Sequence, residues 1–220
     1  MSEVNEVKEA IKPPTVYEMF LCGSIDADSA TEFCKLAGQN YNRDPFVINV
    51  NSTGGDVNAG LVINDVLDTF MTNVAFVVGC FSGSMAVTLM QNPDYFRLAY
   101  KSSRLLCHGL KVTVVGGMDE VANQCNNVNV VRENIIDRYS RACGLEGDEL
   151  IEKVFNKDRL YSAQDALELG TRGLIDAIIL RDFGAHKYLC RTRGGLKVID
   201  IIKHTPHDIP DLPVWEPPKK

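Results

Sequence analysis

Short runs of strand-forming residues alternate along this chain with longer segments of helical periodicity. Residues 46–50 are such a run and lead to a glycine pair, after which residues 57–70 place apolar side chains three or four positions apart. A second run at 74–79 leads through small residues into an apolar helical pattern at 85–90. The order strand, glycine-rich turn, helix, strand, small-residue turn, helix predicts βαβ units in a parallel α/β sheet.

The same patterns predict the other elements. A strand at 16–22 precedes a helix that Asp26 or Asp28 can cap. A long helical pattern at 118–143 ends at Gly144, and glycine commonly ends helices. The remaining expectations are strands at 95–100, 103–109 and 174–180, a further short strand at 112–117, and short helices at 148–157 and 162–169.

Candidate chemistry lies in the two turns, because parallel α/β sheets bind ligands beyond the carboxyl ends of their strands. Ser84 follows the second strand directly and would sit on a sharp strand-to-helix turn, the layout of a nucleophile elbow. The amides of Met85 and Gly55 could together form an oxyanion hole. Gly54 and Gly55 would let the backbone approach a substrate closely. The alternative is a tight turn in which Ser84 only caps the following helix.

A serine nucleophile needs a base, and His108 is the only histidine in the first 185 residues. His108 ends a predicted strand and precedes a glycine, so it would also lie at a strand end. Asp158 is a candidate orienting carboxylate between two predicted helices, although an aspartate there could equally be a surface charge or a helix cap. Cys107 is a weaker nucleophile candidate, because on a strand it would point away from His108.

These motifs together resemble the ClpP family of self-compartmentalised serine proteases. The run Asn51-Ser52-Thr53-Gly54-Gly55 resembles the glycine loop of that family, and Gly83-Ser84-Met85 resembles its active turn at the same spacing. Cys107-His108 resembles the end of the strand with the catalytic histidine, and 158–163 resembles the block with the catalytic aspartate. The resemblance covers roughly 17–180 and implies an α/β, ClpP/crotonase-like fold, with a parallel sheet of βαβ units and a long handle helix.

Carried over residue by residue, the resemblance implies Ser84 as nucleophile, His108 as general base and Asp158 as the residue that orients the imidazole. It implies the amides of Gly55 and Met85 as the oxyanion hole. The chain has one residue fewer between serine and histidine than typical members. Counting back from His108 without a gap would put Gly83 at the nucleophile position; the ungapped count from Gly55 lands on Ser84, which we prefer.

The resemblance also implies partners. They are polypeptide substrates, a homo-oligomer of stacked rings paired through the handle, and an AAA+ unfoldase. Two departures bear on the unfoldase. Residues 1–15 are too short to hold both the helix and the pore loop of relatives, and Val47 and Asn49 stand where relatives carry docking tyrosines. Docking of the usual unfoldase is therefore doubtful.

Chain length and composition set the domain organisation. We expect a lead-in at 1–15, a protease domain at 16–182 with its handle at about 110–143, and a C-terminal extension at 183–220 with a proline-rich end. Hydrophobic content of 45% and charged content of 24% are those of an ordinary globular protein. Seven cysteines without metal-ligand spacing indicate a reducing compartment rather than disulfides or zinc.

Charge and the N-terminal sequence bear on location. A net charge of −6 argues against nucleic acid or an anionic membrane as the main partner. The N-terminus has no apolar signal region, so we expect a cytoplasmic protein, or one in the host cytoplasm if a virus encodes it, with an organelle as an alternative. No cofactor or metal is implied.

Two other functions stay open. One is a catalytically inactive, ClpP-like structural ring subunit, which the Gly83 alignment would favour. The other is a crotonase-type acyl-CoA enzyme, since that fold also uses paired backbone amides as an oxyanion hole. Whether Ser84 can reach His108 separates the first from a protease, and binding of coenzyme A would indicate the second.

Overall fold

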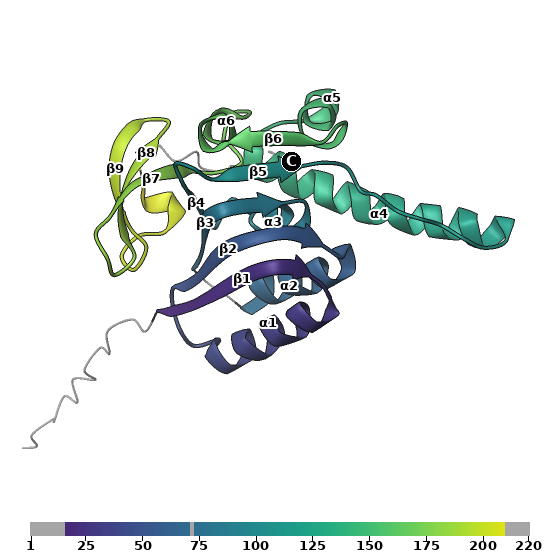
Figure 1. Ribbon diagram of the computed structural model, residues 1–220, viewed down its shortest axis with the longest axis horizontal. Coiled ribbons are helices and arrows are strands. Elements are labelled where there is room, and N and C mark those ends of the chain that lie inside the picture. The colour runs from purple at the N-terminus through teal and green to yellow at the C-terminus, as the bar shows by residue number, and fades with distance from the viewer. Residues whose placement is uncertain (1–15, 71–72, 210–220) are drawn as a thin grey trace, which may run out of the picture.

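The computed structural model describes residues 16–70 and 73–209, and its centre is one large sheet (Figure 1). The parallel strands β1 (Tyr17–Ile25), β2 (Phe46–Gly55), β3 (Val74–Gly83), β4 (Phe96–Tyr100) and β7 (Ala177–Asp182) lie side by side in that order. The antiparallel strands β8 (Lys187–Thr192) and β9 (Gly195–Asp200) extend it past β7. Strand β5 (Arg104–Cys107) pairs with the end of β3, and β6 (Arg159–Ser162) pairs antiparallel with β5.

Helices connect the parallel strands as the periodicity predicts. The helices are α1 (Ala27–Asn40), α2 (Val57–Phe70), α3 (Met85–Leu89), α4 (Met118–Cys143), α5 (Gly147–Leu150) and α6 (Ala163–Glu168). A π-helical turn spans Ile151–Phe155, and a 3-10 turn spans Pro206–Asp208. Within the described ranges, no helix is long and apolar enough to cross a membrane.

The predicted helix boundaries follow from local chemistry. Asp26 caps α1, since its carboxylate accepts a hydrogen bond from the amide of Ser29 at 2.9 Å. Gly144 ends α4 with φ of 66°, a left-handed conformation that glycine adopts without steric cost. The expected long helix at 118–143 is therefore confirmed at both ends.

Four local expectations were wrong. Residues 112–117 form no strand; they run as irregular chain beside α4. The expected helix at 148–157 is split into α5 and the π-helical turn. Residues 159–162 form strand β6, so Asp158 precedes a strand and α6 begins only at Ala163. The last parallel strand starts at Ala177, three positions after the expected start at Leu174.

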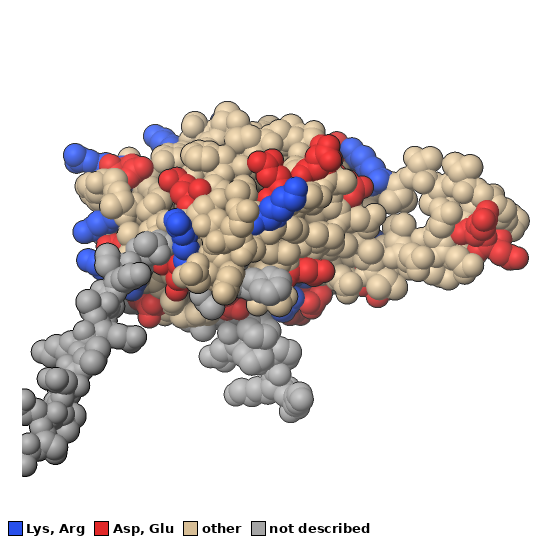
Figure 2. All heavy atoms as spheres, turned by 90° about the horizontal axis from the view of Figure 1, so that it is seen from below, with Lys and Arg blue, Asp and Glu red and all other residues tan. Residues whose placement is uncertain are grey.

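Helix α4 projects from the body (Figure 1). Its C-terminal part is anchored, because Ile135, Tyr139 and Cys143 are buried, whereas its first half is largely exposed. Figure 2 shows few charged side chains on this projection apart from an acidic group at its tip, where Asp119 and Glu120 occupy the first turn. The C-terminal part of α4 is thus packed against the body, and its N-terminal half is exposed and mainly uncharged.

A buried arginine joins the main sheet to the base of α4. The guanidinium of Arg97 on β4 pairs with Asp176 at 2.5 Å and donates to the carbonyl oxygens of Ala142 and Gly173. Burial by itself lowers the pKa of Arg97, but the Asp176 carboxylate outweighs this and raises it. Arg97 therefore stays charged in the core, where its contacts hold three segments in register.

Candidate active site

The candidate site forms where β2, β3 and β5 end and β6 begins. Gly83, the last residue of β3, pairs with Leu106 on β5, so Ser84 lies beside the end of the strand that leads to His108. Cys107 pairs with Arg159 across the antiparallel β5–β6 ladder. His108 and Asp158 are the next residues beyond that pair. The sheet therefore brings Ser84, His108 and Asp158 to neighbouring positions although the first and the last lie 74 positions apart in the sequence.

Ser84 has a strained backbone. Its φ of 53° and ψ of −124° are unusual for a residue with a side chain. Its amide donates to the carbonyl oxygen of Leu106 at 2.7 Å, which fixes the turn against β5. Ser84 occupies the N-cap position of α3, but its hydroxyl makes no capping hydrogen bond. The alternative that the serine serves to cap the helix is therefore not supported by its contacts, and strain of this kind is typical of functional sites.

Glycine is required where β2 passes the turn that carries Ser84. A Cβ on Gly54 would lie 2.4 Å from the carbonyl oxygen of Gly83 and 2.8 Å from the amide nitrogen of Met85. A Cβ on Gly55 would lie 2.1 Å from the carbonyl oxygen of Ile25. The hydroxyl of Ser52 accepts from the Gly54 amide at 3.1 Å and holds this loop in shape. The two glycines let the loop lie against the turn that carries Ser84.

Met85 is set by similar close packing. It is the first residue of α3, so its amide lies outside the hydrogen-bond ladder of that helix. Its side chain is buried against Gly60 of α2, where an added Cβ would lie 2.3 Å from the Met85 Cγ. The Met85 amide is thus held at the turn, next to the glycine loop, as an oxyanion donor would need to be.

His108 makes a hydrogen bond with its own neighbour. Its Nδ1 lies 2.6 Å from the carbonyl oxygen of Gly109. A carbonyl oxygen can only accept, so Nδ1 carries the proton and Nε2 of the neutral ring is left as the acceptor. This is the tautomer that a general base for a serine needs. Within the described chain, no hydrogen bond joins Ser84 Oγ to His108, and triads without substrate are often loose.

Asp158 contacts Lys111 rather than His108. Its Oδ2 lies 3.2 Å from Lys111 Nζ, and the two side chains are 60% and 69% exposed. The strand register thus places Asp158 beside His108, but the Asp158 carboxylate is bonded to Lys111 instead. Lys111 lies outside every motif identified in the sequence, so no sequence signal pointed to it.

Cys107 is unsuited to nucleophilic chemistry. Its side chain is buried, and burial raises the pKa of its thiol far above the ordinary value, with a smaller contribution from Cys143. A thiol must ionise to attack, so the neighbouring Cys107 remains a core residue.

A cleft of about 450 Å³ opens beside the glycine loop. Its walls are the loop from Gly55 to Asn58, the irregular segment from Leu110 to Val114, and one face of α4. The α4 wall consists of Gln124, Asn127, Val128 and Val131. Segment 110–114 contributes backbone that no strand of the described chain pairs with. An extended peptide laid in this cleft could pair with it and present a carbonyl to the turn.

Among residues 16–70 and 73–209, no three His, Cys, Asp or Glu side chains gather as a metal site would need. The chemistry on offer is that of a serine, a histidine, a carboxylate and backbone amides.

The fold and the site define an α/β subunit with a strained serine at a strand-to-helix turn and a long projecting helix. A profile of the Clp protease family matches residues 14–182, and the chain belongs to that family. Its fold is that of the ClpP subunits, as the sequence predicted.

Relatives match over most of their length. The chain is 27% identical over 168 residues to the ATP-dependent Clp protease proteolytic subunit 2 of Mycolicibacterium paratuberculosis, covering 74% of this chain and 82% of the relative. It is 30% identical over 169 residues to the ATP-dependent Clp protease proteolytic subunit 1 of Chlamydia trachomatis serovar D, covering 73% and 85%.

Proposed function

We propose that this chain is a serine endopeptidase subunit of a self-compartmentalised ring protease. The observation that carries the proposal is the strained, uncapped Ser84, held between the Gly54–Gly55 loop and the strand that leads to His108. Membership of the Clp protease family supports a serine protease subunit independently of this geometry.

The proposed reaction is acyl transfer to Ser84. The Oγ of Ser84 attacks the peptide carbonyl carbon while Nε2 of His108 takes the hydroxyl proton. The amides of Met85 and Gly55 stabilise the oxyanion, a contribution worth about 10²- to 10³-fold for each donor. The protonated imidazole then gives its proton to the leaving amine, and water activated by His108 releases the acyl group. Asp158 would orient the ring and stabilise its charged form once it turns from Lys111.

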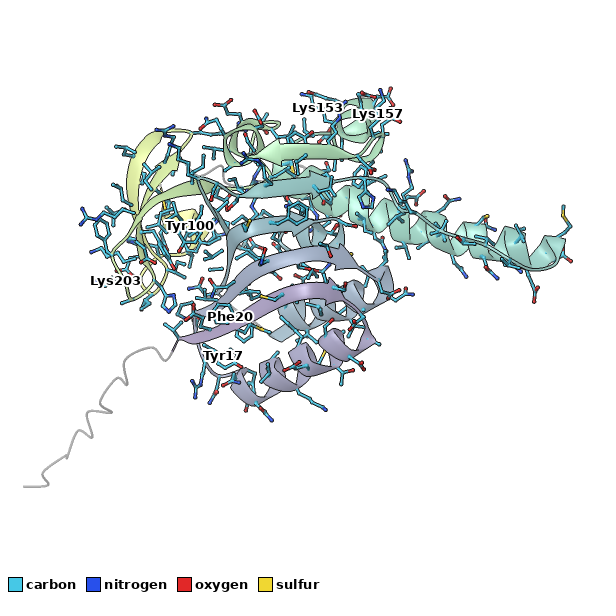
Figure 3. All side chains as sticks on the ribbon, viewed as in Figure 1. Tyr17, Phe20, Tyr100, Lys153, Lys157 and Lys203 are labelled. Atoms are coloured by element: carbon cyan, nitrogen blue, oxygen red, sulfur yellow. The ribbon has the colours of Figure 1, made fainter. Side chains whose placement is uncertain are left out.

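The proposed partners follow from the family and from the surface. We infer that substrate polypeptides bind as an extended strand along segment 110–114, and that subunits form rings paired through α4. An AAA+ unfoldase would have to dock on an altered surface. Val47 is buried, and Asn49 donates to the carboxylate of Glu18 at 2.6 Å. Phe20 stands exposed on the adjacent strand β1 (Figure 3). We further propose a cytoplasmic location, with the host cytoplasm or an organelle as alternatives.

A direct test is cleavage of an unfolded polypeptide such as casein by the purified full-length oligomer. We expect cleavage by the wild type, none by Ser84→Ala, and full cleavage by Ser102→Ala, which removes an exposed hydroxyl in the β4–β5 turn. Cleavage that survives Ser84→Ala would overturn the assignment.

Two contacts favour a second candidate, a catalytically inactive ring subunit. Asp158 contacts Lys111, and His108 is bonded to Gly109. Such a subunit would assemble normally and leave casein intact. A crotonase-type acyl-CoA enzyme is the third candidate, and measurable binding of coenzyme A to the oligomer would favour it.

A further inference from the structure

Lys111 occupies a position that links the cleft to the catalytic residues. It lines the cleft beside Gly55, and its ammonium group contacts Asp158, the residue in register with His108. Lys111 lies only three positions after His108, on the segment that leaves β5. Lys111 and His108 therefore leave the same short stretch of chain, and of the two Lys111 is the one that contacts the carboxylate.

The imidazole is already bonded without Asp158. The Gly109 carbonyl oxygen accepts from His108 Nδ1 and so holds the tautomer that Asp158 would hold. The carbonyl is neutral, however, and lacks the full negative charge that would stabilise the imidazolium formed during reaction. The state described by the structure thus has a correctly protonated base with its charge partner bound elsewhere.

The contact that holds Asp158 is weak. Both side chains are more than half exposed, and an exposed ion pair shifts an equilibrium by at most about five-fold. It is also screened by salt, since the Debye length falls from about 10 Å at 0.1 M to about 3 Å at 1 M. A contact of this strength can be exchanged readily for another.

We propose that Lys111 is a positioning residue that competes with His108 for the carboxylate of Asp158 and so sets how often Ser84, His108 and Asp158 are connected. This inference rests on the proposed serine-protease function and adds to it a residue outside the motifs. The charge of Lys111 then slows acylation, and anything that draws this charge from Asp158 raises the rate.

The test is the rate at which a fluorophosphonate probe labels Ser84 in the full-length oligomer, measured from 0.05 to 0.5 M salt. We expect Lys111→Met to raise the second-order rate about two- to five-fold at low salt, the range that an exposed pair allows. In the wild type, salt should raise the rate towards that of the variant, and in Lys111→Met the salt dependence should be lost. Lys111→Arg keeps the charge and should keep the wild-type salt dependence.

Two further variants separate this role from a general change of charge. Lys157 adjoins Asp158 in sequence and extends from the surface near Lys153 (Figure 3), so Lys157→Met removes a nearby charge without breaking the Lys111 contact. It should leave the rate and its salt dependence unchanged. In an Asp158→Asn background, Lys111→Met should have no effect, because the carboxylate for which Lys111 competes is gone.

The outcomes are distinct. Labelling of Ser84 at equal rates and with equal salt dependence in the wild type and Lys111→Met overturns the role of Lys111 and leaves the protease proposal standing. The role of Lys111 is also overturned if Lys157→Met raises the labelling rate as much as Lys111→Met does. The same holds if Lys111→Met raises the rate equally in the Asp158→Asn background. If the probe labels Ser84 in none of these proteins, both proposals are overturned.

Discussion

Ser84 adopts a conformation that costs free energy, and its neighbours show how the fold sustains it. The turn is fixed by the Leu106 carbonyl on one side and by the Gly54 backbone on the other. Strain at a single non-glycine residue costs about 1–3 kcal/mol and persists only where the surroundings impose it. Gly54 is the residue whose lack of a side chain makes this arrangement possible.

Gly54→Ala should disable the site. Its φ of +83° costs an alanine about 1–2 kcal/mol, and the added Cβ would meet the Gly83 carbonyl oxygen. The added Cβ would displace the loop that carries the proposed oxyanion donor, the Gly55 amide. We therefore expect labelling of Ser84 to slow by about 100-fold or more. The matched control is Gly38→Ala in α1, where an added Cβ meets nothing within 4 Å. That change should keep the labelling rate and leave stability equal or up to about 1 kcal/mol higher.

The residues of the site differ in how far sequence could predict them. Ser84, Met85 and the glycine pair belong to short local motifs, so the sequence indicated them before the sheet was known. The contact of Asp158 with Lys111 could not be predicted, because it depends on how the irregular segment after β5 folds back towards β6. Periodicity carries no information about such a segment.

Among the elements, the base of α4 is held by the carboxylate of a single residue, Asp68. Asp68 on α2 accepts two hydrogen bonds from the Arg138 guanidinium and others from Tyr95 and Asn92. Burial by itself raises the pKa of Asp68, but the bonds from Arg138, Tyr95 and Asn92 outweigh it and leave the pKa below 3.8. The projecting helix is thus tied to the body by a carboxylate that is ionised at neutral pH.

Asp68→Asn should lower stability in a pH-dependent way. Because the folded-state pKa is depressed, the carboxylate stabilises the fold at pH values above its unfolded pKa, and the stabilisation is lost as pH falls through the folded value. We expect a loss of about 1.5–3 kcal/mol at pH 7, the range for hydrogen bonds to charged groups. Thermal unfolding of both proteins from pH 7 to pH 3 measures it.

The difference between wild type and Asp68→Asn should be constant above about pH 5 and shrink as pH falls below 4. Asp137→Asn is the control, since its exposed i,i+4 pair with Arg141 should change stability by no more than about 0.5 kcal/mol. A difference that stays unchanged down to pH 3 would contradict the role given to Asp68.

The elements themselves were predicted unevenly. The long helix was predicted correctly because its stripe is long and Gly144 marks its end. Residues 112–117 are rich in valine and suggested a strand, but no neighbouring strand of the described sheet is available to pair with them. β6 was missed because four residues carry too little periodicity to identify a strand. Its pairing with β5 depends on the tertiary structure, which local sequence does not encode.

In the whole molecule, direct contacts connect the turn that carries Ser84 to the base of α4. Thr88 of α3 contacts the Tyr139 hydroxyl of α4 at 3.3 Å, and Tyr139 packs edge-on against Phe155. The C-terminal hairpin of β8 and β9 completes the sheet, so part of the segment expected as an extension continues the main fold. The projecting part of α4 has exposed apolar side chains at Met118 and Val130.

Val130→Asp should weaken assembly while leaving the subunit folded. Val130 is 58% exposed on the projecting helix, so a charge there costs the subunit little. If rings pair through α4, burying an unpaired carboxylate at that interface is unfavourable. We expect native mass spectrometry to detect a smaller oligomer, whereas Asn129→Asp on the same helix serves as the charge-matched control. An unchanged oligomer would count against pairing through this part of α4.

The central claim is that Ser84 is a nucleophile activated by His108. The most direct measurement is fluorophosphonate labelling of the full-length oligomer, followed by mass mapping of the modified residue. We expect one adduct per subunit on Ser84, absent in Ser84→Ala and strongly reduced in His108→Ala. A folded, assembled oligomer that stays unlabelled, or one labelled elsewhere, would contradict it and would favour a structural ring subunit.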